Sequence, residues 1–290
     1  MSLEHGLNKH FKIVLPYQTY KGAIPLNAPA IRKDGRTWAG GDIVLVQRVN
    51  ALESKDSERI NAWGNQFYDL SDACIVFEDK VKPQPNSPLL KGIRGVALDG
   101  DYVAVDAKSV EDAIKSGAME HFKVTESATV QYKNDGKLQN EIVENIVLLP
   151  YDRDSIKLNS DQYDSIDAKE FNRKDFIHGR DMEESEIVKD GKVIHDIWGM
   201  YEDRIIVPLV KKVFAHNKEE HGYDTNMGVF LPSETKDKAK MRAFYVNRLG
   251  DGSRFDGYDG LGSGDSCLLG VVENAEGVAQ KLEYAKPAQE

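Results

Sequence analysis

The segment RLGDGSRFDGYDGLGSGDSCLLGVV, residues 248–272, joins a run rich in glycine and aspartate to an apolar end. Between Asn247 and Cys267 it contains no Lys, Glu, Gln, Met or Trp, although the chain as a whole is rich in Lys and Glu. Its last six residues, CLLGVV, predict a buried strand. The preceding MRAFYVNRL, residues 241–249, predicts a strand that leads into the glycine-rich part. We therefore expect a long loop held between two strands.

Composition limits the class of protein before any motif is considered. The chain has 290 residues, enough for one large domain or two ordinary ones. With 40% hydrophobic and 30% charged residues it is expected to be globular, and no apolar run approaches the roughly 18 residues that span a bilayer. The formal net charge of -10, with no local basic patch, argues against phosphate binding. We expect neither membrane insertion nor a nucleic-acid partner.

The N-terminal stretch MSLEHGLNKHFKIVLPY, residues 1–17, lacks a cationic region followed by a long apolar core. It therefore contains no recognisable secretion signal. The two cysteines, Cys74 and Cys267, provide neither a disulfide framework nor a set of four metal ligands. The localisation is left unknown, with the cytoplasm as the default and surface display by an unseen route as the alternative.

The first ninety residues are expected to be rich in strands. DIVLVQRV (Asp42–Val49) and ACIVFE (Ala73–Glu78) are short β-branched runs bounded by turn residues. VKPQPNSPLLKG (Val81–Gly92) contains three prolines and several polar residues, so it predicts an extended surface connector and the best candidate domain boundary. Residues 1–90 are assigned as a β-rich N-terminal portion, either a separate unit or an elaboration of the same core.

The rest of the chain is expected to contain both strands and helices, beginning in strand, helix, strand order. Pro208 is expected to mark either the start of a long helix or a bend within it. Turn residues predict three hairpins and apolar periodicity predicts two helices, the longer one ended by a glycine. The hairpins are expected at Asp99–Gly100, Asn134–Gly136 and Asp190–Gly191, and the helices from Ser109 and within Met200–Gly222.

Common catalytic and metal-binding patterns do not fit the aspartates and histidines. An EF-hand frame begun at Asp251 puts Phe255 where an oxygen ligand is needed. The serine of Gly-Asp-Ser, Ser266, does not lie in a G-x-S-x-G turn. His216 and His221 are five residues apart, so they do not form the i, i+4 pair that binds zinc on a helix. We therefore predict no catalytic residue, no metal site and no cofactor.

Three features of the C-terminal part together resemble a known protein family. They are the motif MRAFYVNRLG (Met241–Gly250), the Gly, Asp, Ser, Arg, Phe, Tyr and Cys residues scattered among regularly placed glycines and leucines, and the terminal LLGVV. The chain resembles the variable proteins of diversity-generating retroelements, and most of all their archaeal, nanoarchaeal type. In that family an error-prone reverse transcriptase randomises template adenines, most often in AAC codons, which cannot yield Lys, Glu, Gln, Met or Trp. The resemblance covers roughly the last 50 residues. It implies a C-type lectin fold.

The resemblance also implies that a rigid scaffold holds randomised side chains outward as a ligand-binding surface. Leu249 and Leu261 are expected to anchor the loop inward, while its glycines let the backbone turn. A lone Cys267 fits a randomised position, and its alternative is a small buried apolar residue. The variable, ligand-binding residues are expected to be Phe244, Asn247, Arg248, Asp251, Ser253, Arg254, Phe255, Asp256, Tyr258, Asp259, Ser263, Asp265, Ser266 and Cys267.

The expected architecture is α+β: a C-type lectin-like domain at residues 91–290, variable at about 241–272, after the β-rich portion. In such a fold the first and last strands should meet. The expected function is non-enzymatic binding of an unknown protein or surface ligand, with the oligomeric state unassigned. Two alternatives stay open. One is a carbohydrate-active or hydrolytic enzyme that uses the Asp/Gly-rich loop, and the other is a viral structural surface component.

Overall fold

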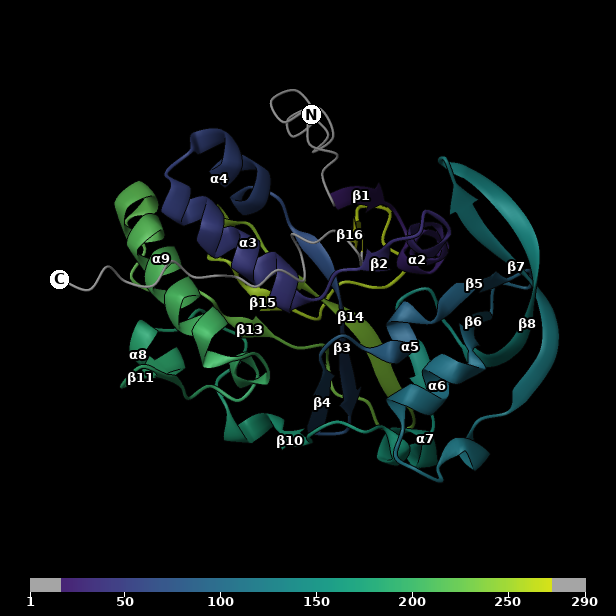
Figure 1. The fold of residues 1–290 in the computed structure, drawn as a ribbon. Coiled ribbons are helices and arrows are strands. Elements are labelled where there is room, and N and C mark those ends of the chain that lie inside the picture. Colours follow the sequence, from purple (N-terminus) through teal and green to yellow (C-terminus); the bar gives the residue numbers. More distant parts are fainter. Residues whose placement is uncertain (1–16, 273–290) are drawn as a thin grey trace.

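The computed structural model describes residues 17–272 and has an α+β fold built on one large mixed sheet (Figure 1). Six strands cross this sheet in the order β1-β16-β3-β14-β15-β13, and four further strands pair beside them. Residues 1–16, which make up nearly all of the N-terminal stretch expected to lack a secretion signal, lie outside the described residues. The strands of the sheet are β1 Tyr17–Lys21, β2 Thr37–Trp38, β3 Tyr68–Phe77, β4 Lys80–Gln84, β9 Ile156–Leu158, β10 Phe171–Asn172, β13 Val229–Phe230, β14 Ala239–Val246, β15 Phe255–Asp256 and β16 Cys267–Val271.

The first and last described strands lie side by side, as the resemblance implies. β1 and β16 are antiparallel from the pair Tyr17 and Val271 to the pair Lys21 and Cys267. On its other side β16 meets β2 and also touches β3. All five residues of β16 are buried, which confirms the buried strand predicted for the apolar run at the end of the segment.

One face of the sheet is covered by three helices, α3 (Gly41–Ser54), α4 (Ser57–Gly64) and α9 (Asp203–His221) (Figure 1). The strand predicted at Asp42–Val49 is wrong, because this stretch belongs to α3. The helix packs against α4, α9 and β3, and most of its residues are buried, so no polar stripe reveals a helical period. Its first amide, that of Gly41, donates to the buried Asp72 carboxylate at 2.7 Å.

The long helix α9 confirms the apolar periodicity of the sequence. Its buried residues face the core, and it ends at Gly222, which adopts the left-handed conformation with φ of 73°. Pro208 lies inside the helix, after its first turn, rather than at its start.

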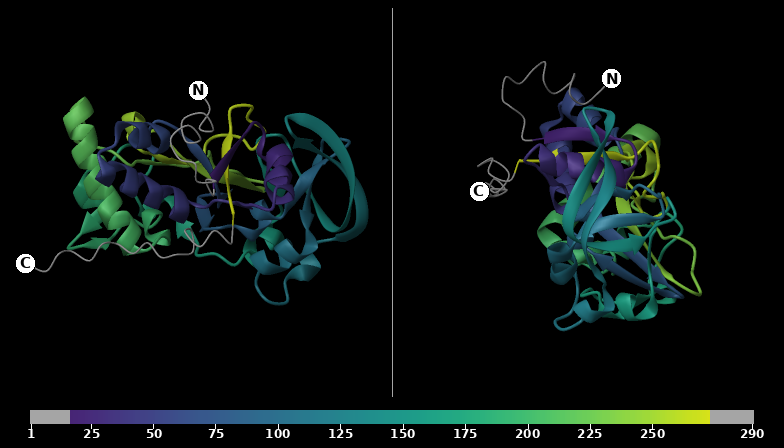
Figure 2. Two further views of the ribbon diagram at one scale, coloured as in Figure 1. Left: turned by 45° about the horizontal axis from the view of Figure 1, so that its top comes forward. Right: turned by 90° about the vertical axis from the view of Figure 1, so that its right-hand side faces the viewer.

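The other face packs against α2 (Ile24–Lys33) and a closed four-stranded unit in the order β5-β6-β8-β7. Figure 2 shows this unit at the end of the molecule opposite α9. The turns predicted at Asp99–Gly100 and Asn134–Gly136 are confirmed as the links between β5 and β6 and between β7 and β8. The strands of this unit are β5 Ile93–Ala97, β6 Tyr102–Asp106, β7 Val124–Asn134 and β8 Lys137–Pro150.

The stretch Val81–Gly92 is not the extended surface connector predicted from its prolines. It forms most of β4 and the short helix α5 (Pro88–Lys91), and Val81, Leu89 and Leu90 are fully buried. Pro88 begins the helix, where a missing amide costs nothing. The sheet therefore combines strands from both sides of residue 90, and the first ninety residues supply helices as well as strands.

Short elements complete the fold. The helix predicted from Ser109 begins two residues earlier, as α6 (Ala107–Ala113), and no side chain caps it. The predicted hairpin turned at Asp190–Gly191 is confirmed. Among the described residues no helix is both long and apolar enough to cross a membrane. The remaining elements are α7 Ser160–Ser165, α8 Glu184–Ile187, β11 Val188–Lys189, β12 Lys192–Val193 and 3₁₀ turns at Met119–His121, Arg173–Asp175, Trp198–Met200 and Leu249–Asp251.

Candidate binding surface

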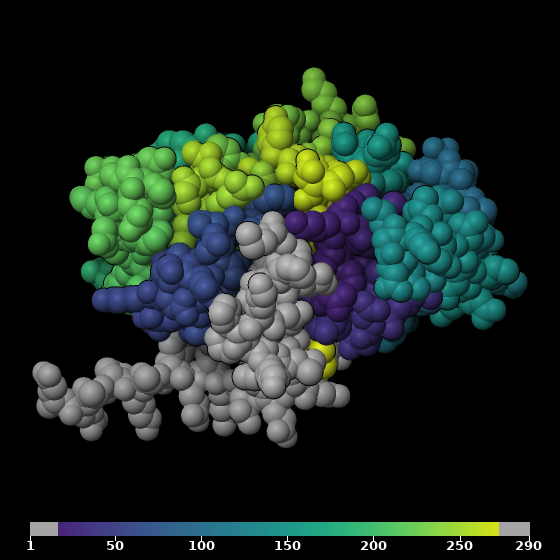
Figure 3. All heavy atoms as spheres, turned by 90° about the horizontal axis from the view of Figure 1, so that it is seen from above, coloured from purple at the N-terminus to yellow at the C-terminus, as the bar shows by residue number. Residues whose placement is uncertain are grey.

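The 241–272 segment leaves the sheet through β14, returns briefly as β15 and re-enters it as β16. β15 pairs with β14 on one side and β13 on the other. Figure 3 shows the end of the segment as a yellow band at the surface, between green residues of the α9 region and purple residues near the N-terminus. The segment thus alternates between sheet positions, which are fixed, and loops, which reach solvent.

Eight of the fourteen residues predicted to bind ligand have side chains that reach solvent. Tyr258 is the most prominent, with 58% of its surface exposed. A large exposed aromatic side chain with polar neighbours is typical of binding surfaces. The exposed residues are Arg248, Asp251, Tyr258, Asp259 and Asp265, and the half-buried ones are Asn247, Arg254 and Ser263.

The other six predicted residues are buried, so the prediction that their side chains point outward is wrong. Phe255 is fully buried, with its ring centroid 4.4 Å from that of Phe244 and 5.1 Å from that of Trp198. It belongs to the core under α9 and not to a surface patch with Arg254, Tyr258 and Asp259. The six buried residues are Phe244, Ser253, Phe255, Asp256, Ser266 and Cys267.

A buried guanidinium fixes the first part of the segment. Arg48, on α3, has no solvent exposure and donates to the Ser253 hydroxyl at 2.7 Å. The same group donates to the carbonyl oxygens of Trp63 at 3.0 Å and Gln66 at 2.8 Å. These charge-assisted hydrogen bonds tie the segment to α3 and to the loop before β3. Sequence reasoning missed Arg48, whose signal is an arginine within the apolar run IVLVQRV.

Asp256 and Arg242 fix the backbone of the loop that carries Tyr258. The Asp256 carboxylate accepts a hydrogen bond from the Tyr258 amide at 2.7 Å, and Arg242 donates to the Tyr258 carbonyl. Burial raises the pKa of Asp256, and a hydrogen bond from the Tyr245 hydroxyl opposes that rise. Burial also raises the pKa of Asp259, while the Arg242 charge lowers it. The exposed ring of Tyr258 therefore stands on a fixed backbone.

The end of the segment is held by Asp69, a buried carboxylate of β3. The Cys267 amide donates to Asp69 Oδ2 at 2.6 Å. Burial raises the pKa of Asp69 to about 7, opposed by the Cys267 amide and reinforced by the charge of Asp259. The Cys267 thiol is itself buried, and its pKa is raised to about 12, chiefly by burial. Cys267 is therefore the small buried residue that the sequence left as its alternative.

Asp69→Asn is expected to make the free energy of unfolding less dependent on pH. Between pH about 4 and 7 the folded chain holds a proton on this carboxyl that the unfolded chain, with its ordinary pKa of 3.8, has released. The contribution of Asp69 to stability therefore falls as pH rises through this window. Asparagine cannot ionise, yet its carbonyl can still accept from the Cys267 amide. Urea unfolding at pH 5 and pH 8 measures the change, with exposed Asp265→Asn as control; an undiminished pH dependence in Asp69→Asn would contradict it.

Glycines and leucines set the path of the loop. Leu249 and Leu261 are buried, which confirms their inward anchoring. Gly252 has φ of 78°, as a turn requires. Gly257 and Gly262 are needed for space instead, because an added Cβ would lie 3.0 Å from Cys74 Sγ and 2.5 Å from the Arg153 carbonyl oxygen. The backbone path of the segment therefore does not depend on its exposed side chains.

A polar cavity of about 500 Å³ adjoins the exposed residues where α9 ends. Arg254 forms two hydrogen bonds to the Asp181 carboxylate, at 2.9 and 2.7 Å, and lies over the Phe230 ring. Asp251 lines the same cavity beside the half-exposed Tyr223. Such a site offers hydrogen-bond acceptors, an aromatic face and one guanidinium to a polar group of a ligand.

The serine and the two histidines considered as catalytic or metal-binding candidates are buried or paired with other rings. Ser266 is buried, so its hydroxyl is not presented to a substrate. The rings of His216 and His221 lie 6.5 Å apart and edge to face, and His221 stacks near Tyr223. Within residues 17–272 no group of three or more His, Cys, Asp or Glu side chains is placed to hold a metal ion.

No protein-family model matches the sequence, and no curated protein is significantly similar to it. Among solved structures the chain is similar to a protein of Nanoarchaeota in which the C-type lectin fold accommodates massive sequence variation. The alignment covers 88% of this chain and 96% of that one, with 12% sequence identity and a TM-score of 0.36. A likeness at this level carries no inference about function, which is therefore argued from the residues of this chain.

Proposed function

We propose that this chain is a ligand-binding protein of the C-type lectin type, and that a retroelement diversifies the exposed residues of the 241–272 segment. The observation that carries the proposal is the division of the segment into two sets of residues. Eight predicted positions reach solvent, while the backbone between them is held by Arg48, Asp69, Leu249 and Leu261. A surface whose side chains are not needed for folding can change its specificity without loss of structure.

The path of the chain supports the fold part of the proposal. The first and last described strands pair with each other, which brings the start of the described chain to the end of the 241–272 segment. The ligand is proposed to be a protein or another surface group, bound without a metal or a cofactor. Tyr258 and Tyr223 offer aromatic contacts, and Asp251, Asp259 and Asp265 offer acceptors.

Simultaneous replacement of five exposed residues is expected to leave the fold intact. Exchanging Arg248, Asp251, Tyr258, Asp259 and Asp265 for other polar or aromatic types should shift the melting temperature by less than about 4 °C, because exposed side chains contribute little to stability. The matched control exchanges buried positions of the same segment, Phe244, Ser253 and Cys267, and should unfold the chain. Equal losses in both sets would contradict the division.

The retroelement part has its own test in the source genome. We expect a near-copy of the DNA that encodes residues 241–272, differing at adenines and lying beside a reverse transcriptase gene. Substituted codons should fall at the exposed positions and spare those of Leu249, Leu261 and Phe255. A complete genome without such a copy would remove this part of the proposal and leave a binding protein of fixed specificity.

An assay with chromogenic glycosides and esters tests the alternative that the chain is an enzyme. Turnover of such a substrate that is abolished by Asp259→Asn would favour this alternative.

A further inference from the structure

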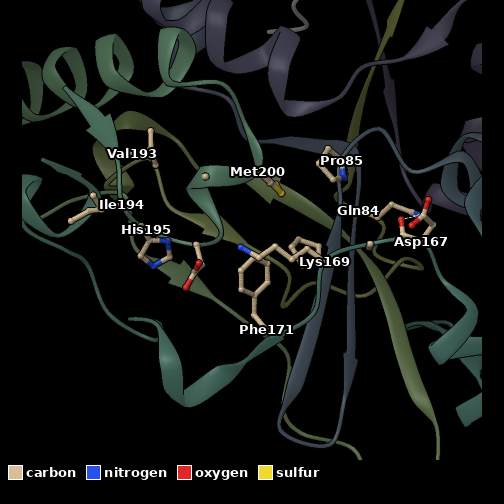
Figure 4. A pocket seen from close by; sticks show the side chains of 13 residues that line it. Gln84, Pro85, Asp167, Lys169, Phe171, Val193, Ile194, His195 and Met200 are labelled. Carbon is tan, nitrogen blue, oxygen red and sulfur yellow. Dashed lines mark hydrogen bonds between the residues drawn. The ribbon is translucent and has the colours of Figure 1, made fainter. Parts of the chain in front are cut away.

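A second cavity lies away from the 241–272 segment and shares no lining residue with it (Figure 4). Its volume of about 470 Å³ is within the range of small-molecule pockets. Three stretches form its walls: the end of β4 with Pro85, residues 167–171, and the corner from β12 to the 3₁₀ turn at Trp198–Met200. Because these stretches are far apart in the chain, the cavity is a product of the fold and not of one loop.

Several apolar side chains line the cavity beside its polar groups. Ile194 has 52% of its surface exposed, although it is a large aliphatic residue. Phe171 and Met200 also line the cavity and are half-buried, and Pro85 lies on the side away from Ile194 (Figure 4). An aliphatic group placed here would remove apolar surface from water on several sides at once.

Three charged side chains, Asp167, Lys169 and Asp196, line the same cavity, and no ion pair joins any two of them. The exposed Asp167 lies beside Gln84, on the side away from His195 (Figure 4). The Lys169 ammonium lies 4.5 Å from the centroid of the Phe171 ring, and no carboxylate within residues 17–272 pairs with it. Figure 4 shows the Lys169 side chain crossing over Phe171 toward the wall that carries His195. Asp196, next in the chain to His195, is half-buried and lines that wall. Asp196 is half-buried and Lys169 is exposed, and neither has an ionic partner among the described residues, so the two groups suit a ligand that carries both charges.

Two other polar side chains of the cavity, His195 and Gln84, already have hydrogen-bond partners. His195 Nδ1 accepts from the amides of Ile197 and Trp198, while Nε2 contacts the Ile177 carbonyl at 2.8 Å. This arrangement fixes a neutral ring with no free nitrogen. The Gln84 amide donates to the Ala113 carbonyl at 3.1 Å and accepts from the Ser87 hydroxyl at 2.7 Å. No serine, threonine or cysteine lines the cavity.

We propose that this cavity binds a free α-amino acid with an aliphatic side chain. The Lys169 ammonium pairs with the carboxylate of the ligand, Asp196 pairs with its ammonium, and the side chain lies on Ile194, Met200 and Phe171. A ligand with one charge would leave one of the two protein groups without a partner, so both ligand charges contribute to selectivity. The site is separate from the proposed binding surface, so either can fail without the other.

L-Leucine is the probe that tests this site. Titrated into the full chain and followed by calorimetry, it is expected to bind with a Kd of about 1 mM. L-Leucinamide, which lacks the carboxylate, and 4-methylpentanoate, which lacks the ammonium, should each bind at least about tenfold more weakly. Absence of saturable binding of L-leucine up to about 20 mM would overturn the proposal.

Two variants test which protein group binds which charge of the ligand. Lys169→Met should abolish the preference for L-leucine over L-leucinamide, and Asp196→Asn should abolish its preference over 4-methylpentanoate. Lys174→Met, an exposed lysine outside the cavity, is the matched control and should change neither preference. Each variant should lose one preference and keep the other, whereas a general loss of folding would remove both. Preferences that survive in both cavity variants would overturn the assignment.

Discussion

Phe255→Ala is expected to lower the free energy of unfolding by about 3–5 kcal/mol. The ring is fully buried and packs against Phe244, Trp198 and Tyr201, so its removal leaves a cavity under α9. The loss includes the transfer energy of the ring and the contacts that its neighbours no longer make. Urea unfolding followed by circular dichroism measures it.

The matched control is Tyr258→Ala, three residues further along the segment. Its ring is 58% exposed, so we expect a change within about 0.5 kcal/mol. If the two variants lost similar amounts of stability, Phe255 would not be a core residue and the division of the segment into fixed and free positions would be wrong.

Arg48→Met is expected to cost about 3–5 kcal/mol, because it leaves several buried acceptors without donors. Methionine fills part of the volume but cannot serve the carbonyl oxygens of Trp63 and Gln66 or the Ser253 hydroxyl. Burial lowers the pKa of the Arg48 guanidinium to about 10, so the group stays charged at neutral pH. The unfolding midpoint in urea measures the loss.

The exposed Arg59, on α4, provides the control for Arg48. Arg59→Met should change stability by no more than about 0.5 kcal/mol. Hydrogen exchange adds a local readout: in Arg48→Met we expect faster exchange of amides near Ser253 than near β8. A stability loss below about 1 kcal/mol in Arg48→Met would show that water replaces the guanidinium, and the anchor would not be structural.

The sequence predicted correctly those helices and strands that are determined by short-range patterns such as an apolar stripe or a turn residue. The long helix ending at Gly222 has an apolar stripe and a glycine stop, and the hairpins have turn residues at their tips. The buried strand β16 followed from an apolar run. By contrast, α3 is covered on most sides by other elements, so its sequence IVLVQRV shows no alternation between faces and its β-branched residues suggested a strand.

The candidate site was predicted only in part, because burial within it depends on distant partners. The composition of the 241–272 segment cannot show that β15 is clamped between β13 and β14, which turns Phe255 into the core. Arg48 and Ser253 are 205 positions apart, and no short-range pattern joins them. The cavity beside Lys169 also escaped sequence reasoning, since three separate stretches build it and no motif marks any of them.

The pairing of β16 with β1, β2 and β3 bears on how the chain matures. β1 and β2 reach the sheet only through this strand, which is the last described element to emerge during synthesis. A nascent chain that stops within the 241–272 segment therefore lacks the strand that closes its fold. We expect such products to be degraded, so that only molecules with an intact 241–272 segment accumulate in the cell.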